Sequence, residues 1–195
     1  MRRLLRLLPL LAALAAVACG VPPDGAPAPG APAEVARLAR AIEALGPEVD
    51  PEEAARAARI AYAHTYRLAE DYEIEDPPLV HNTKVNLGLK PRGLCWHWAE
   101  DMETRLAEER FETLDLHRAI ANADNPFRIE HSTAIVSARG ASMFDGIVLD
   151  PWRRGGVLFW EHTQADTDYG WRPRGLVLSE KRRRAQSTAF VPQRP

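Results

Sequence analysis

The sequence predicts an α+β domain in which helices come first and an antiparallel β-sheet follows. Apolar residues recur at helical spacing between about residue 34 and residue 106. From residue 114 onward, short β-rich runs alternate with turn residues. The chain has 195 residues, 46% hydrophobic and 27% charged, which suits one ordinary core and excludes collagen-like, coiled-coil and wholly disordered chains.

The first eighteen residues have the pattern of a secretory signal. Three arginines precede an apolar run from Leu7 to Val17, which is too short to span a bilayer. The run ends in Ala16–Gly20 (AVACG), which resembles the lipobox of bacterial lipoproteins, where the signal is cut before a Cys that becomes lipidated. We expect a signal peptide over 1–18 and lipidation at Cys19, with an ordinary secretory signal or a signal anchor as the alternatives.

Residues 19–33 are expected to form a tether between lipid and domain, since Val21–Ala33 contains five Pro, four Ala and two Gly and has almost nothing to bury. Removal of the signal leaves 22 basic and 27 acidic side chains, a net charge of −5, so neither nucleic acid nor a polybasic contact with lipid is expected. Gly20 after the Cys resembles the sorting pattern of lipoproteins on the periplasmic face of the outer membrane.

Two helices should open the domain. Apolar residues at helical spacing predict a helix over Glu34–Leu45, which Gly46 ends. The second begins at Asp50–Glu53 (DPEE), which offers an N-cap acceptor, a first-turn Pro and a Glu at the capping-box position, and it should run to about Tyr72.

The nucleophile candidate, Cys95, follows a segment that we expect to be irregular, Leu79–Gly93, after the helix-breaking Pro77-Pro78. A helix is predicted from Leu94 on, because apolar residues recur there at every fourth position: Leu94, Trp98, Met102 and Leu106. Cys95 then lies in the first turn, where free amide hydrogens and the helix dipole favour thiolate over thiol.

Strands are expected at Leu114–Ala121, His131–Ala138, Gly146–Trp152 and Val157–Thr163, with a short last one at Leu176–Leu178. No second domain boundary is evident, so residues 34–180 should form a single domain. A basic, solvated tail over 181–195, with the run Lys181–Arg184, should follow.

His131 and Asp150 could complete a thiol site. A hairpin that is symmetric about the bond between residues 140 and 141 places His131 opposite Asp150 on one face of the sheet. The carboxylate could then accept a hydrogen bond from one imidazole nitrogen and leave the other for the sulfur of Cys95. A shift of one residue would instead put the two side chains on opposite faces.

Three stretches support a family resemblance: Gly93–Trp96 (GLCW), Glu130–Ala134 (EHSTA) and Val148–Trp152 (VLDPW). A Cys on a helix, then a His and an Asp on successive antiparallel strands, resembles the transglutaminase-like branch of the papain-like cysteine peptidase superfamily. Together with His81-Asn82 it looks like a group of small bacterial envelope lipoproteins of undefined activity.

The resemblance implies a papain-like core with the nucleophile helix packed on the sheet. It also implies roles for three residues: Cys95 as nucleophile, His131 as general base and acid, and Asp150 as the residue that orients the imidazole.

The remaining site predictions concern the oxyanion and the substrate groove. The Cys95 amide is the natural first oxyanion donor, and Asn82 or Asn86 could supply a second. Trp96 and Trp152 could line a groove for the substrate. No metal or cofactor is expected, because the other histidines show no zinc spacing.

The predicted function is acyl transfer at a peptide or carboxamide bond by a peptidase, amidase or transamidase. Its substrate would be a peptide, a protein or a peptidoglycan peptide. The alternatives are a non-catalytic lipoprotein that keeps the scaffold for binding or assembly, and a structural tether between membrane and peptidoglycan.

Overall fold

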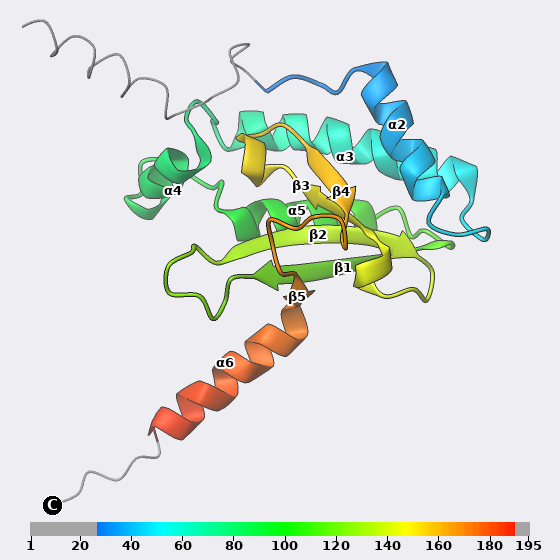
Figure 1. Ribbon diagram of the computed structural model, residues 1–195. Helices are drawn as coiled ribbons and strands as arrows, with labels where there is room; N and C mark the ends of the chain where they lie inside the picture. Colours follow the sequence, from blue (N-terminus) through cyan, green and yellow to red (C-terminus); the bar gives the residue numbers. More distant parts are fainter. Residues whose placement is uncertain (1–26, 190–195) are drawn as a thin grey trace, which may run out of the picture.

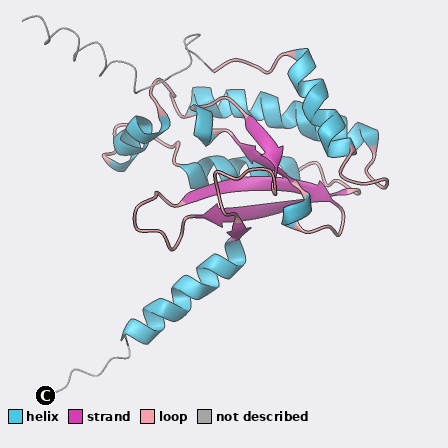
Figure 2. Cartoon of the chain, viewed as in Figure 1, coloured by secondary structure: helices cyan, strands magenta, loops and turns pink. Residues whose placement is uncertain are grey.

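The computed structural model describes residues 27–189, and within them helices cover an antiparallel sheet (Figures 1 and 2). The helices are α2 (Pro32–Glu43), α3 (Pro51–Asp71), α4 (Pro78–Asn86), α5 (Cys95–Ala107) and α6 (Arg174–Ala189). The strands are β1 (Leu114–Ala121), β2 (His131–Ala138), β3 (Ile147–Asp150), β4 (Phe159–His162) and β5 (Arg172–Pro173), in the order β4-β3-β2-β1-β5. The predicted α+β class is confirmed, whereas the signal peptide, Cys19 and most of the tether lie outside the described residues.

The start of α3 confirms one half of the expected cap and corrects the other. Asp50 accepts hydrogen bonds from the amides of Glu52 and Glu53 at 2.7 and 3.0 Å, as an N-cap residue does. Glu53 does not close a capping box. Its carboxylate accepts instead from the amides of Glu112 and Thr113, both at 2.8 Å, and so joins the start of α3 to the segment that leads into β1.

Two segments were predicted wrongly. Residues 78–86, expected to be irregular, form α4, because Pro78 occupies the first helical position, where its fixed φ and missing N–H suit a helix start. Leu176–Leu178 lies in α6 and not in a strand, and α6 extends the helix through the expected basic tail to Ala189. This segment is rich in Arg, Lys and Glu, which favour helix over strand.

The hairpin between β2 and β3 differs from the expected one by two residues. Ala134 pairs with Leu149 and Ile135 with Val148, so Asp150 falls in line with Thr133 and not with His131. The connection is asymmetric because it contains the short 3₁₀ turn η2 (Met143–Asp145), which is capped by Ser142. A shift of two residues keeps both side chains on the same face of the sheet.

The core has three apolar clusters. The largest lies between the sheet and α2, α3 and α5, and includes Leu38, Met102 and Leu149. A second surrounds the start of α5 with Cys95, Trp98 and Trp152. The third covers the opposite face of the sheet with Ala119, Ile135 and Trp171. No helix between residues 27 and 189 is long and apolar enough to cross a membrane.

Candidate active site

Cys95 is the first residue of α5, and the loop before it is tied to the helix by His97. The Nδ1 atom of His97 accepts hydrogen bonds from the amides of Gly93 and Leu94 at 3.1 and 3.2 Å. The amides of Cys95 and Trp96 are among the first four of the helix, which have no carbonyl partner within it. Cys95 is 8% exposed as a residue, and its thiol donates to the carbonyl of Glu130 at 3.6 Å.

Gly93 is required by the packing behind the nucleophile. Its φ of 122° is a backbone conformation that suits glycine, and a Cβ at this position would lie 2.4 Å from Nε2 of His81. His81 is buried, and the same nitrogen donates to the carbonyl of Arg92 at 2.8 Å. This histidine of α4 therefore supports the loop that positions Cys95.

His131 and Asp150 form a buried pair. Nε2 of His131 lies 2.6 Å from Oδ2 of Asp150, and each side chain is 1% exposed. Burial lowers the pKa of His131, but the charge and hydrogen bond of Asp150, assisted by the neighbouring Cys95 thiol, outweigh it and raise the pKa to about 9. The other nitrogen, Nδ1, is buried without a hydrogen-bond partner among the described residues.

Arg153 extends this pair into a chain of alternating charges. Its Nε donates to Oδ2 of Asp150 at 3.0 Å, and its two terminal nitrogens donate to the carboxylate of Asp166 at 3.0 and 2.7 Å. Burial raises the pKa of Asp150, but His131 and Arg153 lower it below the ordinary value. Trp171 donates its indole N–H to Asp166 at 2.9 Å, so each charge in the chain has a partner.

Aromatic rings surround the imidazole of His131. The ring centroids of Trp152 and Tyr169 lie 4.7 and 4.6 Å from it, and that of Trp171 lies 5.4 Å away. His131 thus lies where the cluster around Cys95 meets the cluster on the opposite face of the sheet. The rings exclude water from the His131–Asp150 hydrogen bond, which strengthens it.

An open cleft of about 490 Å³ adjoins this pair. One side is formed by the start of α4 and the other by the loop between β1 and β2. The residues that line it are Pro77, Pro78, Leu79, Val80, Asn122, Arg128, Ile129, His131, Trp152, Arg153 and Tyr169. Apolar side chains dominate the walls, and the polar groups come from Asn122, Arg128, His131, Arg153 and Tyr169; Cys95 is not among the lining residues.

The structure brings together some of the secondary predictions and not others. Trp152 lines the cleft, and its indole N–H donates to Oδ1 of Asn82 at 3.0 Å. Because its oxygen is engaged, Asn82 has its Nδ2 atom as the remaining donor beside the site. Asn86 is exposed at the last position of α4, and Trp96 is 45% exposed; neither lines the cleft.

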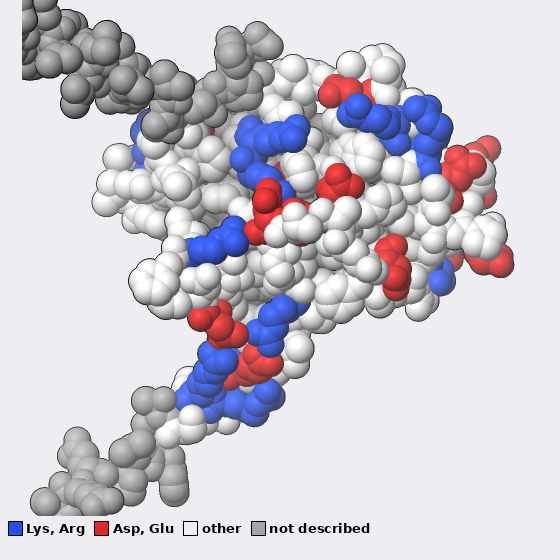
Figure 3. Space-filling model, viewed as in Figure 1, with Lys and Arg blue, Asp and Glu red and all other residues white. Residues whose placement is uncertain are grey.

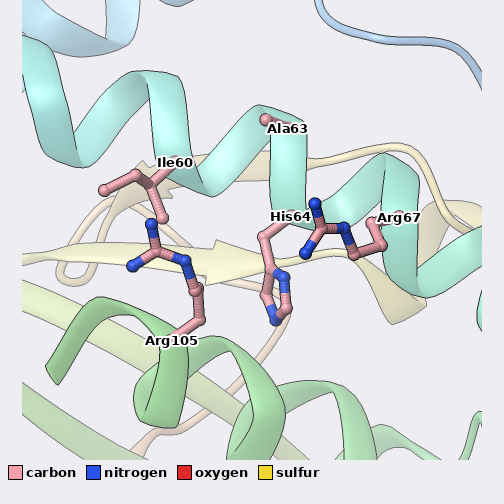
Figure 4. Close-up of a pocket in the computed structure, with 5 residues that line it drawn as sticks. All are labelled: Ile60, Ala63, His64, Arg67 and Arg105. Atoms are coloured by element: carbon pink, nitrogen blue, oxygen red, sulfur yellow. The ribbon is translucent and has the colours of Figure 1, made fainter. Parts of the chain in front are cut away.

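A second, smaller cavity of about 180 Å³ lies between α3 and α5 (Figure 4). His64 points into it between Arg67 and Arg105, and its Nε2 donates to the carbonyl of Asp101 at 3.1 Å. Burial lowers the pKa of His64. The lining residues include neither a thiol nor a carboxylate, so the cavity offers no nucleophile. In the described part of the chain, no group of three His, Cys, Asp or Glu side chains could hold a metal ion.

Comparison of the chain with protein-family models, curated proteins and solved structures finds no match. The site is therefore interpreted from its own geometry. Sequence reasoning missed Arg153, Asp166 and Tyr169. Only Arg153 had a local signal, since it lies three residues after Asp150 at the start of a tight turn; the other two reach the site by tertiary packing.

Proposed function

We propose that this protein is a lipid-anchored envelope enzyme with a papain-like, transglutaminase-like core that transfers acyl groups from peptide or carboxamide bonds to its Cys95 thiol. One observation supports this most. The His131 imidazole is bound through Nε2 to Asp150, and its other nitrogen is buried and unpartnered beside a free thiol at a helix N-terminus. This is the arrangement that an activated thiol nucleophile requires.

The charge state favours a preformed ion pair. With a pKa of about 9, His131 is protonated at neutral pH, so the proposed reaction starts from an imidazolium that holds the proton and a Cys95 sulfur that attacks as its thiolate. The thiolate attacks the carbonyl carbon, and the carbonyl electrons move to oxygen. His131 then donates its proton to the leaving nitrogen, the C–N bond breaks, and an acyl-thioester with Cys95 remains.

Release of the acyl group reverses these roles. Neutral His131 takes a proton from water or from an acceptor amine as that nucleophile attacks the thioester, and the C–S bond breaks with its electrons on sulfur, which restores the thiolate and the protonated His131. The amide of Cys95 and the Nδ2 atom of Asn82 are the candidate donors to the oxyanion.

The second candidate function is a non-catalytic binding or assembly module on the same scaffold. The position of the thiol favours it: Cys95 is nearly buried, and its thiol donates to the backbone carbonyl of Glu130. Catalytic hydrogen bonds are often long before substrate binds, so the two candidates require a chemical test.

Alkylation by iodoacetamide at pH 6 distinguishes them. If His131 and Cys95 form an ion pair, the wild-type thiol should react at least about tenfold faster than in His131→Ala, because only the thiolate is a nucleophile. His162→Ala, which changes an exposed histidine, should match the wild type. Equal rates in wild type and His131→Ala would exclude the enzyme and leave the binding module.

The lipid anchor has a separate test. Cells that express the full chain should incorporate labelled palmitate into it, and Cys19→Ala should abolish incorporation. An unlabelled wild-type protein would remove the lipoprotein assignment without affecting the thiol chemistry.

A further inference from the structure

Six large apolar side chains are exposed on the two segments that flank the candidate active-site cleft; they are called the apolar rim below. They are Leu79, Val80, Leu87, Leu89, Phe127 and Ile129. Phe127 is 95% exposed, and Leu87 and Leu89 are each 68% exposed. Leu79, Val80 and Ile129 line the cleft itself, and the other three lie further along the same two segments. Single exposed apolar residues are ordinary, but a group of this size on two segments that flank one cleft indicates a contact surface.

The rim continues the walls of the cleft outward. Leu79 and Val80 of α4, and Leu87 at its C-cap, fall within about one third of the helix circumference, because eight residues correspond to slightly more than two turns. Across the cleft, Phe127 and Ile129 lie on the loop between β1 and β2. Figure 3 shows mostly uncharged surface over α4 and the tip of this loop.

The N-terminal end of the described chain lies beside the cleft. A Cβ at Gly156 would lie 3.0 Å from Cγ of Pro27, and one at the adjacent Gly155 would lie 3.8 Å from Cδ of Pro78. Pro78 itself lines the cleft. The chain therefore leaves the domain close to the wall that bears the α4 part of the rim.

The reach of the tether limits which face can meet the membrane. Eight residues separate Cys19 from Pro27, a distance of at most about 29 Å for a fully extended chain. A domain of this length has a radius of gyration of about 15 Å. The part of the tether between Cys19 and Pro27 is therefore no longer than about twice that radius. A lipid on Cys19 thus keeps the side of Pro27 nearest the bilayer.

We infer that the apolar rim rests on the lipid surface to which the chain is anchored, so that the cleft opens at the lipid–water interface. Exposed Phe and Leu side chains insert into the boundary between lipid headgroups and acyl chains, and they orient a domain that an acyl chain already holds at the membrane. The inference deepens the proposed function and rests on it. It identifies the substrate class as an amide-bearing molecule located at the membrane surface.

A photocrosslinking experiment on the lipidated protein tests this orientation. The photoreactive amino acid p-benzoyl-phenylalanine replaces Phe127 in one variant and Phe144 in the other, and each is reconstituted into vesicles of phosphatidylethanolamine and phosphatidylglycerol. Phe144 is a matched control because it is a 44% exposed aromatic residue in η2, beyond the opposite end of β2. The substituted Phe127 should give several-fold more lipid adduct.

Equal lipid adducts at the two positions, or adducts of the Phe127 variant with protein only, would overturn the inference; adducts with a second copy of the chain would show that the rim is a dimer surface. Mass spectrometry of the N-terminal peptide checks acylation, and a chain without acyl groups would remove the premise that Cys19 anchors the domain.

Crosslinking does not require that the protein be catalytically active. If lipid adducts form while the thiol is inert to iodoacetamide, the enzyme proposal fails and the orientation stands; a reactive thiol without adducts gives the reverse.

Discussion

At the scale of single residues, the charge of Asp150 determines the state of the whole site. This buried carboxylate has two cationic neighbours, His131 and Arg153, each within 3.0 Å. Arg153 in turn binds Asp166 through two hydrogen bonds. Removing one of these charged side chains would leave its buried partner unpaired. The free-energy cost of that unpaired charge is larger than the net stabilisation that the ion pair provides.

The raised pKa of His131 predicts a pH-dependent loss of stability. The pKa is about 9 in the folded chain and 6.5 when unperturbed, so the stabilisation is fully present below pH 6.5 and disappears as the pH rises through 9. The free energy of unfolding should fall by about 3 kcal/mol across this interval. Urea denaturation at pH 6.5 and at pH 9.5 measures the difference.

Two variants separate this effect from other titrations. The decrease in the free energy of unfolding between pH 6.5 and pH 9.5 should be absent in His131→Gln and unchanged in His162→Ala. Burial lowers the pKa values of His64, His97 and His117. Their titration therefore affects stability below about pH 6.5, where it makes the free energy of unfolding rise with pH. A wild-type chain with equal stability at both pH values would show that His131 is not held as a cation.

The sequence was sufficient to pair His131 with Asp150, although the register derived for them was wrong by two residues. The pairing survives because side chains alternate with a period of two, so any even shift keeps both on one face. Arg153 could not be assigned in the same way. Its role depends on Asp166, which no periodic pattern connects to the site.

At the scale of elements, the contact between α4 and the loop before α5 positions the nucleophile. Gly93→Ala should therefore both destabilise the fold and displace Cys95, because its Cβ overlaps the His81 ring and its φ is unfavourable for alanine. We expect a loss of more than about 2 kcal/mol. Urea denaturation and the rate of Cys95 alkylation measure the two effects.

Gly88→Ala is the matched control, since Gly88 also has a positive φ, 73°, but a Cβ there would have no neighbour within 4 Å. It should cost about 1 kcal/mol and leave alkylation unchanged. The double variant His81→Ala with Gly93→Ala should recover part of the alkylation rate by removing the overlap. Identical behaviour of the two single glycine variants would mean that His81 does not support the loop.

Element prediction succeeded where periodicity was long and failed where the local signals were short or mixed. The helix that begins at Cys95 and the strands β1 and β2 were placed from their apolar patterns. The nine residues of α4 have almost no amphipathic pattern, because its exposed face is apolar and His81 is buried. Among residues 174–187 of α6, whose side chains the structure describes, only Val177 is deeply buried, so the short apolar run there resembles a strand although the surrounding residues favour helix.

At the scale of the whole molecule, the site depends on how the helical layer is fixed against the sheet. Cys95 lies in the helical layer, on α5, whereas His131 and Asp150 lie in the sheet, on β2 and β3 (Figure 1). A small slide of one layer against the other would separate sulfur from imidazole. Because apolar contacts are not directional, polar links between the layers are needed to define their relative position.

Glu53 provides such a link, and its removal should weaken the whole fold. Besides the two amides described above, its carboxylate accepts from the hydroxyl of Thr113 at 2.6 Å. Burial raises the pKa of Glu53, but these hydrogen bonds lower it below the ordinary value, so their contribution is present at neutral pH and is lost as the pH falls through the folded-state pKa. Glu53→Gln keeps the shape but replaces one acceptor oxygen by a donor. It should lower the free energy of unfolding at pH 7 by about 2 to 3 kcal/mol.

The neighbouring Glu52 supplies the control, because it lies in the same helical turn but is exposed. Glu52→Gln should change stability at pH 7 by no more than about 0.5 kcal/mol. The difference between wild type and Glu53→Gln should shrink in acid, since a protonated carboxyl accepts these bonds poorly. If the link also sets the relative position of the layers, Glu53→Gln should slow alkylation of Cys95, which lies far along the chain from residue 53. An unchanged alkylation rate in a destabilised Glu53→Gln chain would show that the apolar core alone fixes the two layers.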